Sequence, residues 1–452
     1  MWYTIIDFRK NLLLFKNLGG VSLKHIKNTV GFVKRKLIEP NPIAGIFALT
    51  VSVSALIYFI IYLIIGNGSF VDIFFARGGD RFMDFFNSIR DASQGSAVYT
   101  EREVIYPPMA NLIFLIMSRF TPVMYNNTGK FFGNHLRWGD HASATIIVFF
   151  FFMLCALVLF YTIFKLTKGT ENQRFAFALI ATFSTPLLYM IERGNIIILC
   201  LISLVIYAGT YNSQSRFHRE LGLIALAFSF SLKLYPVIFG WFLLVDKRFK
   251  DAIRCFIYGM IMLVVPSFFF GGPSCLIWVF ANILGFSSSG GTGASALGII
   301  AAYAHIPEKI ATLLAYGWCL ICGLCLVISP YVHKERWKSW LLGTLLILAV
   351  PSLTGIYSWA FIIIPLILFG NQSVGQKLGK KNCAYFILML IPFLLIPGRL
   401  IGAVSNNQIL AYIFTAALSI FLVIDTLLRF KDFIKESKAQ GSGLIKAFTT
   451  KF

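Results

Sequence analysis

The sequence predicts an all-α, polytopic membrane protein with about 12 transmembrane helices. Of its 452 residues, 58% are hydrophobic and only 13% are charged, whereas a soluble domain carries about 25% charged residues. Apolar runs of about 15 to 24 residues recur along the chain, close to the length that a helix needs to cross a bilayer. Because lipid cannot satisfy open backbone groups, these runs must be helices. A β-barrel would instead show alternating segments of roughly ten residues.

The basic residues lie mostly in the segments between the apolar runs. The formal net charge is +21, but the positive-inside bias places Lys and Arg in such loops. We therefore expect the charge to set the orientation in the cell membrane, and we expect no nucleic-acid partner. Residues 1–42 predict a basic amphipathic segment on the cytoplasmic leaflet, and residues 429–452 predict a basic cytoplasmic tail.

Between these ends, residues 43–428 form the predicted multi-span membrane domain. The first span covers about 43–66, and a long polar first outer loop follows at 67–142, interrupted by one apolar piece at 109–118. We predict the later spans near 143–165, 174–190, 195–211, 221–233, 235–245, 255–272, 309–330, 339–354, 357–370, 383–397 and 408–428.

One multi-pass topology places every basic loop on the cytoplasmic side. It requires cytoplasmic termini, and residues 109–118 must enter the interface without crossing the bilayer. It also requires 221–245 to be two short helices that turn near Lys233. The predicted outer segments are then the first loop, the turn at 192–195, the Lys233 turn, a Gly/Ser-rich loop at 273–308, the turn near Tyr357 and a loop from Arg399.

The first outer loop carries two aspartates. Asp80 and Asp84 lie four residues apart, so a helix would place them on one face. Phe82, Phe85 and Phe86 lie roughly opposite. This pattern predicts an interfacial helix whose carboxylates face water or a cleft. An amphipathic surface helix whose carboxylates pair with nearby arginines would give the same pattern, so both interpretations stay open.

Two later turns carry cations. Glu192-Arg193-Gly194-Asn195 joins two apolar runs, either as an interfacial salt bridge or as an arginine presented to an anionic head group. A lysine between two apolar segments, such as Lys233, is costly unless it snorkels or meets an anion. Pro236 breaks the helix beside it.

The topology places these cations on the same side as Asp80 and Asp84. Carboxylates and cations at one membrane surface suit glycosyl transfer from a polyprenyl phosphosugar. A carboxylate takes the proton of the acceptor hydroxyl, and cations stabilise the departing phosphate.

The order of these motifs resembles glycosyltransferase family 87. The resemblance rests on one span, an Asp-Phe helix, Gly95 and Tyr99, Tyr106-Pro107-Pro108, Arg193-Gly194 and Lys233-x-x-Pro236, within about residues 43–250. It implies a GT-C fold whose active site lies on the outer face of the membrane. Two departures, Asn195-Ile196-Ile197 after Arg193-Gly194 and a Gly/Ser loop that keeps only Ser295 and Gly298, concern acceptor and sugar specificity.

The resemblance implies an inverting hexosyltransferase that uses a polyprenyl-phosphate sugar, with mannose as one candidate, and a lipid-linked or cell-envelope glycan acceptor. Asp84, or Asp80 in its place, would be the catalytic base, and we favour Asp84. Arg193 and Lys233 would hold the phosphate, and Tyr106, Glu192 and Asn195 would complete the substrate site.

We expect no cofactor beyond the lipid donor, and the metal requirement stays open because one aspartate pair is not a ligand set. The alternatives are a polysaccharide polymerase or ligase, a transporter or flippase of lipid-linked glycans, and a non-catalytic assembly subunit.

Overall fold

A computed structural model of the chain describes residues 39–65, 82–121, 142–289, 305–349, 356–398 and 406–439. Within these ranges every regular element is helical. The helices (η marks a 3₁₀ helix) are α4 (Pro42–Ile65), α5 (Met83–Ala92), α6 (Ala97–Thr100), α7 (Pro108–Ser118), α8 (Ala142–Leu166), α9 (Glu171–Thr182), α10 (Thr185–Arg193), α11 (Ile197–Thr210), α12 (Arg216–Leu232), η5 (Tyr235–Gly240), α13 (Trp241–Val245), α14 (Phe249–Ser267), η6 (Phe268–Phe270), α15 (Cys275–Ser289), α17 (Glu308–Val332), α18 (Arg336–Ala349), η7 (Ile356–Ile362), α19 (Ile363–Gln372), α20 (Lys380–Leu390), η8 (Ile391–Phe393) and α21 (Asn406–Ala439).

Five of the described helices are long and apolar enough to cross a membrane: α4, α8, α14 with η6, α17 and α21. The pair α9 and α10 raises this number to six if it is one span, bent by 45°. Pro186 lies in the first turn of α10, which explains the break inside the predicted span 174–190. The chain is thus a helical membrane protein, and the total of 12 spans remains a prediction.

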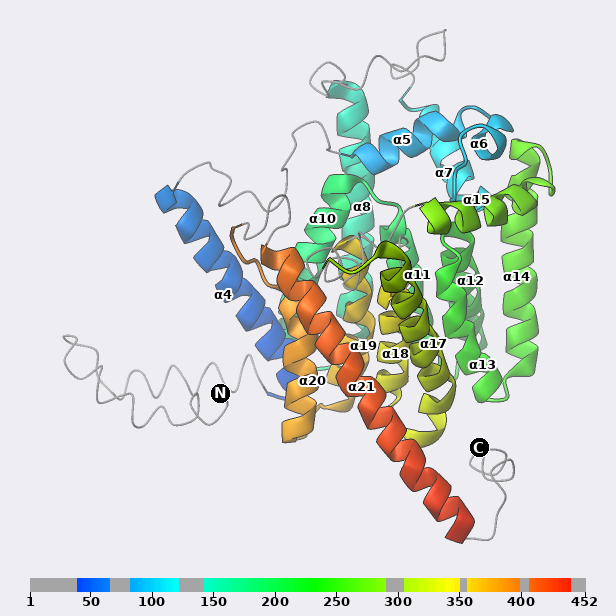
Figure 1. Cartoon of the computed structure of the whole chain (residues 1–452). Coiled ribbons are helices and arrows are strands. Elements are labelled where there is room, and N and C mark those ends of the chain that lie inside the picture. The colour runs from blue at the N-terminus through cyan, green and yellow to red at the C-terminus, as the bar shows by residue number, and fades with distance from the viewer. Residues whose placement is uncertain are drawn as a thin grey trace.

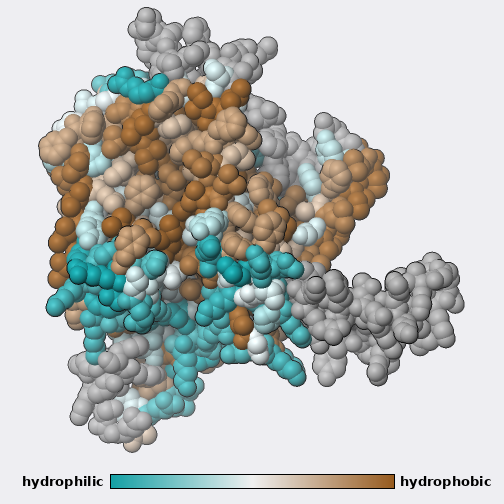
Figure 2. Space-filling view, turned by 180° about the vertical axis from the view of Figure 1, so that it is seen from behind, coloured by the Kyte–Doolittle hydropathy of each residue, from teal (hydrophilic) through white to brown (hydrophobic). Residues whose placement is uncertain are grey.

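The basic loops gather at one end of the bundle, which we call the polar end. Figure 2 shows it as a hydrophilic band below a hydrophobic belt. Asn41, before α4, donates to the carbonyl of Lys168 at 2.7 Å, and the Lys168 amide donates to Asn371 at 2.6 Å. Since these contacts join the start of α4 to the ends of α8 and α19, three helices have a terminus there.

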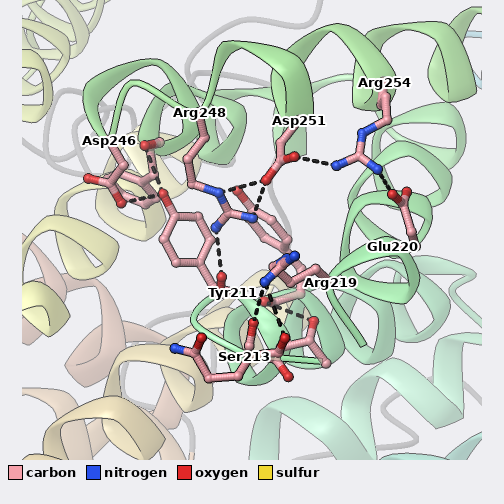
Figure 3. A network of polar contacts seen from close by, with 12 residues as sticks. Tyr211, Ser213, Arg219, Glu220, Asp246, Arg248, Asp251 and Arg254 are labelled. Atoms are coloured by element: carbon pink, nitrogen blue, oxygen red, sulfur yellow. Dashed lines mark hydrogen bonds and ion pairs between the residues drawn. The ribbon is translucent and has the colours of Figure 1, made fainter. Parts of the chain in front are cut away.

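A second network ties further loops together at the polar end (Figure 3). The Tyr211 hydroxyl after α11 donates to Asp246 at 2.5 Å, and Asp246 also pairs with Arg336 at the start of α18. Arg248 donates to the Tyr211 carbonyl at 2.6 Å. Glu220, Asp251 and Arg254 extend the network to the first two turns of α12 and α14. Opposite charges therefore hold these loops together at this end.

The opposite end, which we call the α5 end, carries α5, α6, α7 and α15 (Figure 1, top). The 11 residues of α7 span roughly 16 Å, about half of the hydrocarbon thickness, so this helix is too short to cross alone. The expectation of a loop throughout 273–308 is wrong, because a helix, α15, forms from Cys275. The Asn282 amide donates to the Tyr99 carbonyl at 2.9 Å and so fixes α15 to α6.

Two other expectations also change. The segment predicted as a tail after 428 continues α21 to Ala439. The aromatic face of α5 does not lie on lipid, since Phe85 and Phe86 are buried in the main core. Of the predicted amphipathic segment 1–42, residues 1–38 lie outside the described part of the chain.

Candidate active site

Asp84 lies in the first turn of α5, and the backbone just before it is anchored to the bundle. Phe82 adopts a left-handed conformation with φ 55°, and its amide donates to the Glu192 carbonyl at 2.7 Å. The helix that carries Asp84 therefore begins at Met83 and does not extend back through Phe82, contrary to the expectation that one helical face carries both aspartates. Asp80 lies outside the described residues.

Gly194 brings the end of α10 into contact with the start of α5. It ends α10 with φ 66°, a conformation that glycine adopts without strain. A Cβ atom here would lie 2.9 Å from the Phe85 Cβ and 3.0 Å from the Phe82 Cα. Only a residue without a side chain permits this approach, which places the residues on both sides of Gly194 beside Asp84.

Both carboxylate oxygens of Asp84 are held by this turn. The Arg193 Nη2 lies 2.5 Å from Oδ1, and the Asn195 Nδ2 donates to Oδ2 at 2.9 Å. Asn195 is 1% exposed, and its own Oδ1 accepts from the Ile197 amide at 3.1 Å. This second bond turns the amide nitrogen toward Asp84. Because the side chains of Asp84 and Arg193 remain 20% and 25% exposed, a ligand can reach the pair.

Lys233 stands on the ring of Tyr106. After α12 the chain becomes extended at Lys233, and η5 begins at Tyr235 with Pro236 in its first turn. The ammonium lies 3.9 Å from the centre of the Tyr106 ring, a cation–π contact that favours the charged form, whereas burial lowers the pKa of Lys233 to about 8. The negative charge of the nearby Asp84 carboxylate raises the pKa of both Tyr106 and Lys233.

Tyr106 is fixed from behind by two side chains. The Tyr99 hydroxyl donates to the Tyr106 carbonyl at 3.1 Å, and the Asn111 amide donates to the Tyr99 hydroxyl at 2.8 Å. Burial raises the pKa of Tyr106 well above its ordinary value, and the nearby Tyr357 and Asp84 add to this effect. The phenol therefore stays protonated and can donate a hydrogen bond.

Three further tyrosines border the site. Tyr357, in η7, interacts with Asn195 and stacks with Tyr189, with ring centres 6.3 Å apart. Tyr235 lies beside Tyr106 and Tyr357, and its buried hydroxyl has no hydrogen-bond partner among the described residues. Sequence reasoning did not select these three, although it placed the turns of Tyr235 and Tyr357 on the same side as Asp84.

The structure thus brings together five of the seven predicted site residues: Asp84, Tyr106, Arg193, Asn195 and Lys233. Glu192 is 8% exposed, and its carbonyl anchors Phe82. No group of three His, Cys, Asp or Glu side chains in the described ranges could hold a metal ion. The cluster offers one carboxylate, two cations and several phenols at the α5 end, which suits proton removal next to a developing negative charge.

Comparison with known families identifies the chain. The family model of glycosyltransferase family 87 matches residues 105–353, more than half of the 452-residue chain. No curated protein and no solved structure matches significantly. The matched region, 105–353, starts later and ends later than the range of about 43–250 that carries the sequence resemblance. It contains Tyr106, Arg193, Asn195 and Lys233, and it begins after Asp84. The chain therefore belongs to glycosyltransferase family 87.

Proposed function

We propose that this membrane glycosyltransferase is a GT-C type hexosyltransferase that uses a polyprenyl-phosphate sugar, with mannose as one candidate. The acceptor is a lipid-linked or cell-envelope glycan, and the reaction takes place on the outer face of the cell membrane. The observation that carries the proposal is the contact of Asp84 with Arg193 and Asn195, next to Lys233 on Tyr106.

Asp84 is suited to be the base although both of its oxygens are hydrogen-bonded. A carboxylate has about four lone-pair positions, so an acceptor hydroxyl can donate to Asp84 while Arg193 and Asn195 keep it oriented. The hydroxyl oxygen attacks C1 of the donor sugar, and its proton passes to Asp84. The bond from C1 to the phosphate oxygen breaks, and its electron pair leaves with the phosphate. A single displacement of this kind inverts the configuration at C1.

The cations gain a new role during this step. Arg193 neutralises Asp84 at the start, but protonation of the carboxylate removes that negative charge. The guanidinium is then free to balance the charge that develops on the phosphate, and Lys233 lies on the same side. The charge compensated by Arg193 thus moves from the base to the leaving group as the reaction proceeds.

The test uses purified protein, radiolabelled polyprenyl-phosphate mannose or glucose as donor, and synthetic alkyl glycosides as acceptors. Asp84→Asn should lower the transfer rate by about 10²- to 10⁴-fold and leave donor binding largely intact. The configuration of the product at C1, read by NMR, tests inversion. Asp91→Asn is the matched control, because Asp91 lies on the same helix and pairs with Arg90 instead.

Two results would contradict the proposal. If Asp84→Asn transfers sugar at the wild-type rate, Asp84 is not the base. If the wild-type protein binds and uses neither donor, the polyprenyl-phosphate assignment is wrong.

A further inference from the structure

A cavity of about 510 Å³ lies at the polar end, far from the candidate active site in the fold. Its wall is formed by the last turn of α17, the loop to α18 and the C-terminal turns of α21. The span in α17 ends at Val332, so Tyr331 and Lys334 lie where the hydrocarbon gives way to the head groups. The 34 residues of α21 measure roughly 50 Å against about 30 Å of hydrocarbon, so the helix continues past the same level.

Above the cavity the two helices present apolar stripes. Leu320, Leu324 and Val327 are exposed along α17 at spacings of four and three residues, and the stripe continues to Tyr331 and Lys334.

On α21 the same change from apolar to polar occurs at a constant spacing of four. Ile420, Ile424 and Leu428 are exposed, and Asp432 and Glu436 continue the stripe into the cavity. A row at a spacing of four winds about 40° around the helix per step, so its last apolar residue, Leu428, is the one that adjoins Asp432 at the cavity wall. Acyl chains that lie on Val327 and Leu428 would therefore place their head group in the cavity.

The cavity offers both signs of charge. Lys334 is exposed, and Arg429 donates its Nε to Asp425 at 3.1 Å. Among the described residues its terminal nitrogens have no acceptor, so they can reach a ligand in the cavity. Asp432 and Glu436 provide carboxylates on the facing helix. His333 also lines the cavity, but burial, with the nearby charge of Lys338, lowers its pKa to about 4, so it adds no charge at neutral pH.

We propose that this cavity binds the head group of a phospholipid that carries a primary amine, as phosphoethanolamine does. The phosphate contacts Lys334 and Arg429, and the ammonium donates to Asp432 and Glu436. The third cation of the cavity wall, Arg336, pairs with Asp246. A purely anionic head group would bring its negative charge next to Asp432 and Glu436 with no donor for them, and a trimethylated amine has no N–H to donate. This site does not depend on the proposed transfer reaction.

The experiment is a titration of the purified full-length protein, followed by native mass spectrometry. The probes are phosphatidylethanolamine, phosphatidylcholine and phosphatidylglycerol with identical acyl chains. Phosphatidylethanolamine should bind roughly tenfold more tightly than the other two, the effect of one or two charged hydrogen bonds. Equal binding of all three lipids, or a preference for phosphatidylglycerol, would overturn the proposal.

Variants test the phosphate contact and the ammonium contact separately. Lys334→Gln should weaken all three lipids alike, whereas Asp432→Asn with Glu436→Gln should reduce phosphatidylethanolamine binding to the phosphatidylcholine level. Lys431→Gln and Glu171→Gln are matched controls, since both side chains are exposed at the polar end outside the cavity wall. All substituted residues are exposed, so the variants should fold. Unchanged lipid preference in the double variant would rule out the ammonium site.

Discussion

At the scale of single residues, Gly194 decides whether the candidate site forms. Its left-handed backbone and its contact with Phe82 and Phe85 are both incompatible with a side chain. The charge pair of Asp84 and Arg193 depends on this contact, because the two residues come from segments more than 100 positions apart in the sequence.

We predict that Gly194→Ala lowers the stability of the protein and nearly abolishes transfer. The left-handed conformation alone costs alanine about 1 to 2 kcal/mol, and relief of the clash would move Arg193 away from Asp84. Thermal unfolding in detergent and the transfer assay measure the two effects. Gly317→Ala is the control, since Gly317 lies within α17 with open space around it. Wild-type activity in Gly194→Ala would show that the close approach is not required.

The sequence predicted which residues come together at the candidate site better than it predicted their local structure. The charged turns stood out because Arg193 and Lys233 are costly between apolar segments. In contrast, the start of α5 at Met83 depends on a hydrogen bond from Phe82 to Glu192, a contact with a distant segment that no local pattern reveals. Tyr189, Tyr235 and Tyr357 were not selected as site residues for a similar reason. A tyrosine within an apolar run shows the same sequence pattern as a tyrosine of the hydrophobic core.

At the scale of helices, a buried charge cluster joins α18, α20 and α21. Asp425 is 3% exposed and lies near three cations: Lys338 at 3.4 Å, Lys381 at 2.6 Å and Arg429 at 3.1 Å. The Tyr385 hydroxyl also donates to it at 2.8 Å. Asp425 lies inside the predicted span 408–428, but Lys338, Lys381 and Tyr385 come from two other helices, so the sequence alone does not assign them to it.

We predict that Asp425→Asn destabilises the protein, because Lys338 is 1% exposed and would lose a buried partner. The loss of one member of a buried ion pair costs about 3 to 5 kcal/mol. Glu335, 3.5 Å from the same ammonium, places this variant toward the lower value. The midpoint of thermal unfolding measures the change.

The double variant Asp425→Asn, Lys338→Met should recover most of the stability, since it removes the unpaired charge as well. Lys381→Met is the control, because Lys381 is 47% exposed and an exposed pair contributes at most about 1 kcal/mol. A double variant less stable than Asp425→Asn alone would show that Lys338 is not the residue left unpaired.

At the scale of the whole molecule, the distribution of charge separates two ends. The sequence predicted most helix positions within a few residues, since long apolar runs dominate the pattern. It missed α15, because Cys275–Ser289 is followed by a Gly/Ser-rich stretch that favoured a loop. The orientation of the two ends in the cell membrane, with the polar end in the cytoplasm, remains a prediction.

Cysteine labelling of intact cells tests this orientation. Glu101→Cys and Ser274→Cys, exposed at the α5 end, should react with a membrane-impermeant maleimide. Asn172→Cys and Lys435→Cys, exposed at the polar end, should react only after permeabilisation. The experiment requires a background in which the partly exposed Cys319 and Cys383 are serine. The reverse labelling pattern would place the candidate site in the cytoplasm.

The location of α5 on a segment separate from the helices that carry Arg193 and Lys233 has a consequence for how such an enzyme can diversify. The proposed base, Asp84, lies on a segment that meets the bundle at Gly194, through the Phe82 hydrogen bond to Glu192 and through the rings of Phe82 and Phe85 on Phe152 of α8, while Arg193 and Lys233 belong to other helices. Insertions or exchanges within the segment that carries Asp84 would reshape the side from which the nucleophile approaches. The part that receives the leaving group would be inherited unchanged, so new acceptors can evolve around a constant donor.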